Sequence, residues 1–214
     1  IFAYVSDVSR RPHHAYAQPV SAVVAISGAA ALGKTRLCHA IVDAADHRGM
    51  TTTLVELDGF LKNRSERREE NLSGYNPRAT RFRPLLDTLH TLLFAGQSVD
   101  VPTYDHTTGM HGAAVSLAPA DLVLLDGIMS LHYEVRDHFI SGSIFLQAET
   151  ELIMKAHRLD VDMRERGYSA VKALAHCEAE TREYDRWIHH QVEFADLVVC
   201  IAEDRTMTVR TKTM

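Results

Sequence analysis

Cysteine is scarce in this sequence, which has only three among 214 residues, at positions 38, 177 and 200. The odd number and the wide spacing exclude a disulfide framework and a CxxC metal pair. Chains without disulfides are typical of reducing compartments, so we expect a cytoplasmic location. No apolar run approaches the roughly 18 residues that a membrane helix needs, and no leader pattern opens the chain. We therefore expect no membrane association.

Positive charge is also in short supply, because 28 acidic residues outnumber 23 lysines and arginines and leave a net charge of −5. General nucleic-acid binders carry a basic stripe, so we expect no nucleic-acid partner. Several of the basic residues fall in two runs, at 62–83 and 158–166. An apolar content of 46% over this length suits one globular domain with a buried core. We place a polar lead-in segment at residues 1–20 and the domain at 21–214.

Short apolar runs alternate with amphipathic stretches along this domain. The runs predict strands at Ala22–Ser27, Thr53–Leu57, Leu122–Leu125, Ser143–Leu146 and Leu197–Ile201. Helical spacing predicts helices at Lys34–His47, Pro84–Ala95, Thr150–Leu159 and Ala170–His190. The alternation indicates a mostly parallel sheet with helices on both faces, a three-layer α/β/α fold. The carboxyl ends of the strands then share one edge, where such sheets bind ligands.

The glycine-rich turn after the first predicted strand carries the strongest signal. Residues 28–35 read Gly-Ala-Ala-Ala-Leu-Gly-Lys-Thr, the G-x-x-x-x-G-K-[ST] pattern of a phosphate-binding P-loop. Glycines let N–H groups turn toward phosphate oxygens, and the following helix adds its positive end. Lys34 should reach the β- and γ-phosphates, and Thr35 should offer its hydroxyl to Mg²⁺. The predicted ATP-binding residues are Gly28, Ala29, Ala30, Ala31, Leu32, Gly33, Lys34, Thr35 and Arg36.

Two aspartates come directly after predicted strands. Asp126 follows an apolar strand and precedes a glycine, an arrangement that holds Mg²⁺ directly or through water. Asp58 follows the second strand, where a carboxylate can accept the proton of an attacking hydroxyl. A helix cap or a turn residue is the ordinary alternative for each of them.

The order of these features resembles the uridine kinase and phosphoribulokinase family of P-loop kinases. After the P-loop come LDGF at 57–60, an Asn-Pro turn at 76–77 and AGQSVDVPTYDHTTG at 95–109. DLVLLDGI follows at 121–128, HRLDVDMRERG at 157–167 and FADLVV at 194–199. The resemblance spans most of the chain, from Val23 to about Ile201. No single later landmark is specific, and their shared order carries the match.

The resemblance implies an ATP-dependent kinase with a P-loop NTPase-type fold and a helical lid at about 155–170. It implies that Asp58, Lys34, Arg158 and Arg166 are catalytic, with Asp58 as the base. The lid arginines Arg158, Arg164 and Arg166 are implied to screen charge on the phosphates, with Arg164 counted among the ATP-binding residues. A solvated amphipathic helix is the alternative for these arginines. The implied substrate residues are Asp58, Phe60, Tyr104, Asp105 and His106.

Departures from the uridine kinase pattern concern the acceptor. Val161 stands where a lid arginine is expected, and Asp126 replaces the usual glutamate of the metal strand. The hexapeptide at 104–109 looks more like the phosphoribulokinase side of the family. A nucleoside such as uridine or cytidine is our first expectation for the acceptor, and a sugar or sugar phosphate is the alternative. The arginine-rich stretch at 64–83 either meets an anionic acceptor or forms a solvated surface loop.

A rival from another class is a nucleotide-driven switch that hydrolyses ATP without a small-molecule acceptor. The chain has no glutamine or asparagine clearly placed to orient a water molecule, which disfavours that rival. The intact Lys34, Thr35, Asp58 and Asp126 argue against a degenerate relative that only binds nucleotide. A homo-oligomer, either a dimer or a tetramer, stays open.

Overall fold

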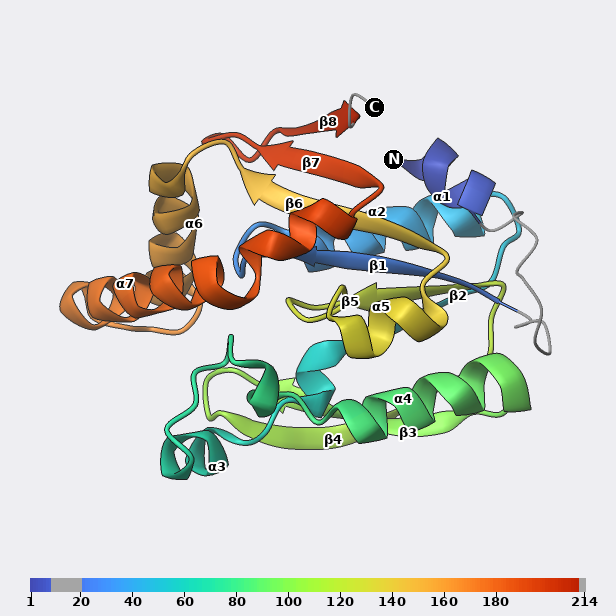
Figure 1. The fold of residues 1–214 in the computed structure, drawn as a ribbon, viewed down its shortest axis with the longest axis horizontal. Helices are drawn as coiled ribbons and strands as arrows, with labels where there is room; N and C mark the ends of the chain where they lie inside the picture. Colours follow the sequence, from blue (N-terminus) through green and yellow to red (C-terminus); the bar gives the residue numbers. More distant parts are fainter. Residues whose placement is uncertain (9–20, 212–214) are drawn as a thin grey trace.

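A six-stranded sheet runs through the middle of the molecule (Figure 1). A computed structural model of the chain describes residues 1–8 and 21–211. The strand order is β2-β5-β1-β6-β7-β8, and all neighbours are parallel except β8, which runs antiparallel to β7. The strands are β1 (Ala22–Gly28), β2 (Thr52–Glu56), β5 (Leu122–Asp126), β6 (Gly142–Ala148), β7 (Leu197–Ile201) and β8 (Met207–Thr211).

The central strands are continuously apolar because helices cover both of their faces. Every residue of β1 and β5 is buried, as a parallel strand in the interior of a sheet requires. The five parallel strands confirm the five predicted ones, with ends that differ by at most two residues. The edge strand β8 was not predicted, since its sequence Met-Thr-Val-Arg-Thr lacks such a run.

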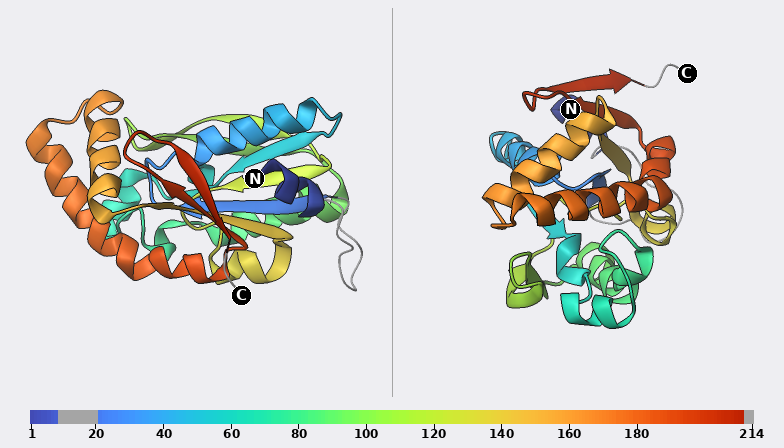
Figure 2. Two further views of the ribbon diagram at one scale, coloured as in Figure 1. Left: turned by 90° about the horizontal axis from the view of Figure 1, so that it is seen from above. Right: turned by 90° about the vertical axis from the view of Figure 1, so that its left-hand side faces the viewer.

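Helices on the two faces complete the three predicted layers. Figure 2 shows α2 on one face of the sheet, and α5 with the short helix at His189–Phe194 on the other. The longer predicted helices are confirmed, although α4 ends in one wide π-type turn at Thr91–Ala95. The helices are α1 (Phe2–Val8), α2 (Lys34–Asp46), α3 (Arg64–Glu69), α4 (Phe82–His90), α5 (Tyr133–Phe139), α6 (Glu151–Arg164) and α7 (Ala170–Trp187).

The first eight residues differ from the irregular segment that the sequence indicated. They form α1, because Val5 and Val8 are fully buried against the core. The Tyr4 hydroxyl donates to Asp196 Oδ2 at 2.6 Å and accepts from the Ser143 N–H at 2.9 Å. These contacts attach α1 to the sheet. The rest of the predicted lead-in, residues 9–20, lies outside the described residues.

A second, two-stranded sheet lies below the main one in Figure 1. It is the antiparallel hairpin of β3 (Val99–Asp105) and β4 (Met110–Leu117), which was not predicted. Six of the eight residues of β4 are exposed, so the strand has no apolar face that a pattern could reveal. The hairpin packs on the short 3₁₀ turn at Leu57–Phe60, where a Cβ on Gly59 would lie 2.3 Å from the Pro102 carbonyl oxygen.

The segment predicted as a lid, at about 155–170, falls within a pair of helices beyond the carboxyl ends of the strands, α6 and α7, which we call the lid helices. Helix α6 leaves β6 and turns into α7, and both project away from the sheet (Figure 1). Side chains of Thr150 and Ser169 cap their amino termini by accepting the N–H groups of Ile153 and Lys172. Within the described part of the chain, no helix is both long and apolar enough to cross a membrane.

Candidate active site

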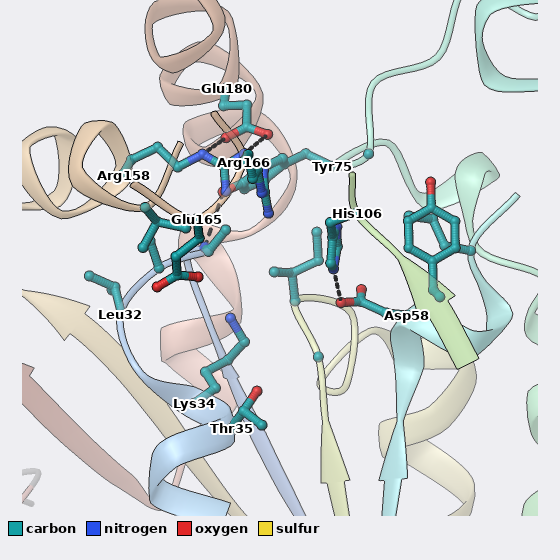
Figure 3. A pocket seen from close by; sticks show the side chains of 18 of the residues that line it. Leu32, Lys34, Thr35, Asp58, Tyr75, His106, Arg158, Glu165, Arg166 and Glu180 are labelled. Atoms are coloured by element: carbon teal, nitrogen blue, oxygen red, sulfur yellow. Dashed lines mark hydrogen bonds and ion pairs between the residues drawn. The ribbon is translucent and has the colours of Figure 1, made fainter. Parts of the chain in front are cut away.

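A cavity of about 560 Å³ opens where the strands of the main sheet end, below the lid helices (Figure 3). Its floor is made by the P-loop and by the ends of β2 and β5, and its walls come from α3, the β3–β4 turn and the lid. This is the edge where the parallel topology was expected to gather polar residues. The cavity contains most of the predicted site residues.

The P-loop keeps its shape through residues with positive φ. Gly28 has φ +132°, and a Cβ there would lie 2.2 Å from the Leu146 carbonyl oxygen, so only glycine fits. Ala31 and Gly33 are left-handed, with φ +65° and +86°. Gly33 immediately precedes α2, and the Lys34 Nζ donates to the Ala29 carbonyl across the loop at 2.9 Å. The loop therefore ends at a helix amino terminus, a favourable site for an anion.

Lys34 is buried on the floor of the cavity among acidic groups. Burial lowers the pKa of Lys34, and the nearby carboxylates of Asp126 and Asp58 act in the opposite direction. A buried ammonium group without an anion of its own is costly. A triphosphate placed on this loop would supply that anion.

Thr35 and Asp126 meet at the end of β5. The Thr35 hydroxyl donates to Asp126 Oδ2 at 2.5 Å, and burial raises the pKa of Asp126, partly offset by Lys34 and the Thr35 hydrogen bond. Asp126 also lies opposite Glu56 in the register of β2 and β5, which places a second carboxylate nearby. Burial, together with Asp126 and Asp58, raises the pKa of Glu56.

These oxygens fit a magnesium ion that shares its coordination with phosphates. Mg²⁺ in nucleotide sites is held by one or two protein oxygens, by phosphate oxygens and by water. Thr35 and Asp126 supply a hydroxyl and a carboxylate, which are the hard ligands required. In the described ranges, no group of three or more acidic, histidine or cysteine side chains could hold a metal alone.

Asp58 faces the cavity from the turn that follows β2. Its Oδ2 lies 2.8 Å from His106 Nε2, and about half of each side chain is accessible (Figure 3). Burial alone would raise the pKa of Asp58. The hydrogen bond and charge of His106 outweigh burial, with help from Lys34 and Arg166, and leave the pKa below its ordinary value. Asp58 is thus an ionised carboxylate at neutral pH.

A buried carboxylate on α6 holds two arginines of the lid helices in position. The Asp162 side chain is fully buried on α6, 3.3 Å from Arg158 Nε, 3.0 Å from Arg166 Nη1 and 2.9 Å from His176 Nδ1. Glu180 on α7 adds a second contact to Arg158 Nε at 2.7 Å. Arg158 and Arg166 both line the cavity, as Figure 3 shows. Their guanidinium groups are therefore held in place before any ligand binds.

Three predicted site residues outside the P-loop do not line the cavity. Arg164 is 80% exposed and paired with Asp160 at 2.7 Å, because its position on α6 points to solvent. Phe60 belongs to the same turn as Asp58, but its side chain is buried in the core. Asp105 accepts the Thr107 N–H and the Thr108 hydroxyl and so holds the hairpin turn. The geometry of the cavity therefore gives no support to the predicted ATP role of Arg164 or to the predicted substrate roles of Phe60 and Asp105.

Other residues predicted to bind ATP or the substrate do line the cavity. Tyr104, His106 and Arg36 line the cavity, and Arg36 Nη2 also donates to the Arg205 carbonyl at 3.1 Å. Residues 30–35 of the P-loop also line the cavity, whereas Gly28 and Ala29 are buried beneath the loop.

Several lining residues escaped the sequence analysis. The Tyr75 hydroxyl accepts the N–H of Ala30 in the P-loop at 3.1 Å. Arg205, in the turn between β7 and β8, adopts φ +65° and donates to Asp160 on the lid at 3.1 Å. Arg67 and Glu180 also line the cavity. None of these lies in a recognisable motif. The arginine-rich run at 64–83 was the one signal that pointed to Arg67.

Comparisons with known proteins agree with this architecture. A model of the phosphoribulokinase / uridine kinase family matches residues 23–208. A chloroplastic phosphoribulokinase of Mesembryanthemum crystallinum is 30% identical over 151 residues, covering 70% of this chain but 37% of that protein. A uridine kinase of Halobacterium salinarum is 29% identical over 69% of this chain and 65% of its own length. The chain thus spans well under half the length of that phosphoribulokinase.

The solved structure of a D-glycerate 3-kinase from Cryptococcus neoformans has the same fold, with a TM-score of 0.73 at 14% identity. The match covers 98% of this chain and 97% of that one. The similarity confirms the predicted α/β fold with its mostly parallel sheet.

Proposed function

The chain belongs to the phosphoribulokinase / uridine kinase family, and from that premise we propose that it is an ATP-dependent kinase that phosphorylates a hydroxyl group of a small molecule. One observation carries the proposal. The P-loop lysine, the Thr35–Asp126 pair and the ionised Asp58 line a single cavity. A phosphate site, a metal site and a base at one sheet edge are the parts that phosphoryl transfer needs.

The nucleotide lies on the P-loop side of the cavity in this proposal. The loop amides and Lys34 bind the β- and γ-phosphates, and Thr35 and Asp126 hold Mg²⁺. Bound there, Mg²⁺ neutralises charge that develops on the phosphates. Arg158 and Arg166 approach from the lid, where Asp162 already orients them. Closure of the lid would exclude water, which otherwise consumes ATP by hydrolysis.

Asp58 is the proposed general base. It faces the same cavity as the P-loop and is ionised, so it can accept the proton of an acceptor hydroxyl that attacks the γ-phosphate. His106 holds one carboxylate oxygen and leaves the other, Oδ1, for the acceptor. The histidine then orients the base.

The identity of the acceptor is a separate question. Relatives and structural neighbours are named for ribulose phosphate, uridine or glycerate. A nucleoside of the uridine or cytidine type was the first expectation from sequence, and a sugar or sugar phosphate the alternative. Both fit a cavity of this size. A cytoplasmic location and a homo-oligomeric state are also proposals that rest on the sequence.

A screen with γ-labelled ATP and magnesium tests the proposal. Uridine, cytidine, free pentoses, pentose phosphates and glycerate serve as acceptors, and the label is followed into each product. We expect label to enter the product of one class of acceptor, at a rate at least tenfold above the rate of ATP hydrolysis by water. ATP hydrolysis that no acceptor stimulates would instead support the switch ATPase.

A further inference from the structure

The arm at residues 61–81, between the 3₁₀ turn at Leu57–Phe60 and α4, carries an excess of positive charge, and its ion pairs follow a pattern. Glu66 pairs with Arg81 at 2.7 Å, and Glu70 pairs with Lys62 at 2.7 Å and with Arg78 at 3.8 Å. Helix α3 lies within this arm, beside the hairpin in Figure 1. Two of the three acids of this arm, Glu66 and Glu70, thus neutralise cations outside α3. Among the residues that the structure describes, no carboxylate pairs with the arginines of α3 itself.

Two of these arginines, Arg64 and Arg67, line the cavity. Arg64 is committed to structure, since its guanidinium donates to the carbonyls of His106, Thr107 and Thr108 and holds the hairpin turn. Gly109 has φ +77° and lies against the Arg64 side chain, where a Cβ would come within 2.6 Å. Arg64 therefore has little capacity left for a ligand.

Arg67 is different. Its Nε donates to the Lys62 carbonyl at 3.1 Å, and its Nη2 donates to the Tyr104 hydroxyl at 2.7 Å. A guanidinium group has five N–H donors, so three remain. No carboxylate within the described ranges lies in salt-bridge distance of Arg67. A partly buried, permanent cation at a cavity wall, oriented by two hydrogen bonds and lacking a counter-ion, is suited to bind an anion.

The position of Arg67 places this charge on the acceptor side. Tyr104, which receives its hydrogen bond, packs edge-on against His106 with ring centroids 5.1 Å apart. His106 in turn holds Asp58 at 2.8 Å. A continuous chain of contacts therefore runs from Arg67 to the proposed base. The P-loop has its own cations, Lys34 and the lid arginines, for the phosphates of ATP.

We propose that Arg67 and the Tyr104 hydroxyl form an anion subsite, so that the acceptor carries a phosphate or carboxylate group besides the hydroxyl that is phosphorylated. This inference rests on the proposed kinase function and selects among its acceptors. It favours a sugar phosphate or a hydroxy acid over a neutral nucleoside. The arginine-rich stretch is then in part a substrate-binding element.

Matched substitutions on α3 provide the test. Arg67→Gln removes the charge but keeps an amide donor near Tyr104, and Arg68→Gln removes the same charge from the neighbouring, exposed position. Transfer is measured for pairs that differ in the anionic group: ribulose 5-phosphate with ribulose, glycerate with glycerol, and uridine as a neutral nucleoside. The ribulose pair tests whether the subsite binds a phosphate group, and the glycerate pair tests whether it binds a carboxylate group.

The wild type should use one anionic acceptor far better than its neutral partner. Arg67→Gln should lower kcat/KM for that acceptor by about 10- to 100-fold, mainly through KM, because a charge-assisted contact is lost. The KM for ATP should not change, and Arg68→Gln should stay within twofold. Preference of the wild type for uridine, or a raised KM for ATP in Arg67→Gln, would overturn the subsite.

Binding calorimetry covers the case in which none of these acceptors turns over. Ribose 5-phosphate and glycerate are titrated into the protein with magnesium and a non-hydrolysable ATP analogue, and ribose serves as the neutral control. Binding of an anionic ligand by the wild type and its loss in Arg67→Gln would support the subsite. Equal binding in both proteins, or none in the wild type, would contradict it. Failure to bind ATP would instead refute the kinase proposal.

Discussion

The floor and the walls of the cavity are built in different ways. The floor consists of strand ends and the P-loop, and its groups are positioned by main-chain geometry, such as the positive φ values at Gly28 and Gly33. The walls consist of α3, the hairpin turn and the lid, and their groups are positioned by other side chains, as Asp162 positions Arg158 and Arg166. Substitutions in the floor should therefore affect chemistry, and substitutions in the walls should affect orientation, stability and choice of acceptor.

Lys34→Ala should have the largest effect of all. The substitution removes the buried ammonium group that faces the phosphates, and no other lysine lines the cavity in the described part of the chain. Loss of such an electrostatic contact should lower kcat/KM by about 10³-fold or more. Steady-state transfer assays measure the loss, with unchanged thermal unfolding as the control. Near-normal activity would mean that the floor is not the phosphate site.

Asp58→Asn should separate chemistry from nucleotide binding. The amide keeps the shape of the side chain and its contact with His106 but cannot accept a proton. Turnover should fall by about 100-fold, whereas calorimetry should give an ATP affinity within about threefold of wild type. Unchanged turnover would remove Asp58 from the role of base. Loss of ATP binding would place it in the phosphate site instead.

The same division explains what the sequence could and could not predict. Floor residues follow each strand at fixed offsets, so the P-loop, Asp58 and Asp126 were located from local patterns. The contacts of the walls join distant segments, such as Arg67 with Tyr104 and Arg205 with Asp160, and local patterns do not contain them. Arg164 shows the limit most clearly. It lies in the expected lid motif, but it is two residues beyond the buried Asp162 on α6, about 200° around the helix, so its side chain lies on the exposed face.

Asp162→Asn should destabilise the lid helices and leave the P-loop and the strand ends of the floor in place. Asp162 is fully buried between two arginines and a histidine, so losing its charge should reduce the free energy of unfolding by about 3 kcal/mol at pH 7. Burial raises the pKa of Asp162, but His176 and the two arginines outweigh it and leave the pKa below its ordinary value.

The sign of the pH dependence follows from that shift. A carboxylate with a depressed pKa stabilises the fold above its unfolded pKa of about 3.9, and this stabilisation is lost as the pH falls toward the folded pKa. The difference between wild type and Asp162→Asn should therefore shrink below about pH 4. Urea unfolding at pH 7, 5 and 3 measures it. A difference that stays constant with pH would show that the Asp162 charge is not what stabilises the lid.

Arg164→Ala should have the smallest effect. Its guanidinium is exposed and, within the described ranges, paired only with Asp160, and exposed ion pairs contribute about 0–1 kcal/mol. We expect kcat and the KM for ATP to change by less than about twofold. Arg166→Ala is the matched comparison, because that arginine lines the cavity and should reduce kcat at least tenfold more than Arg164→Ala. Equal losses in both variants would mean that the lid moves Arg164 inward during turnover.

A crystal structure with magnesium and a non-hydrolysable ATP analogue tests the central claim most directly. The account predicts that the β- and γ-phosphates contact the main-chain amides of residues 29–35 and Lys34 Nζ. It also predicts magnesium at Thr35 Oγ1, with Asp126 beside it or one water molecule away, and the γ-phosphate facing Asp58. Phosphates bound anywhere else in the molecule would contradict the account.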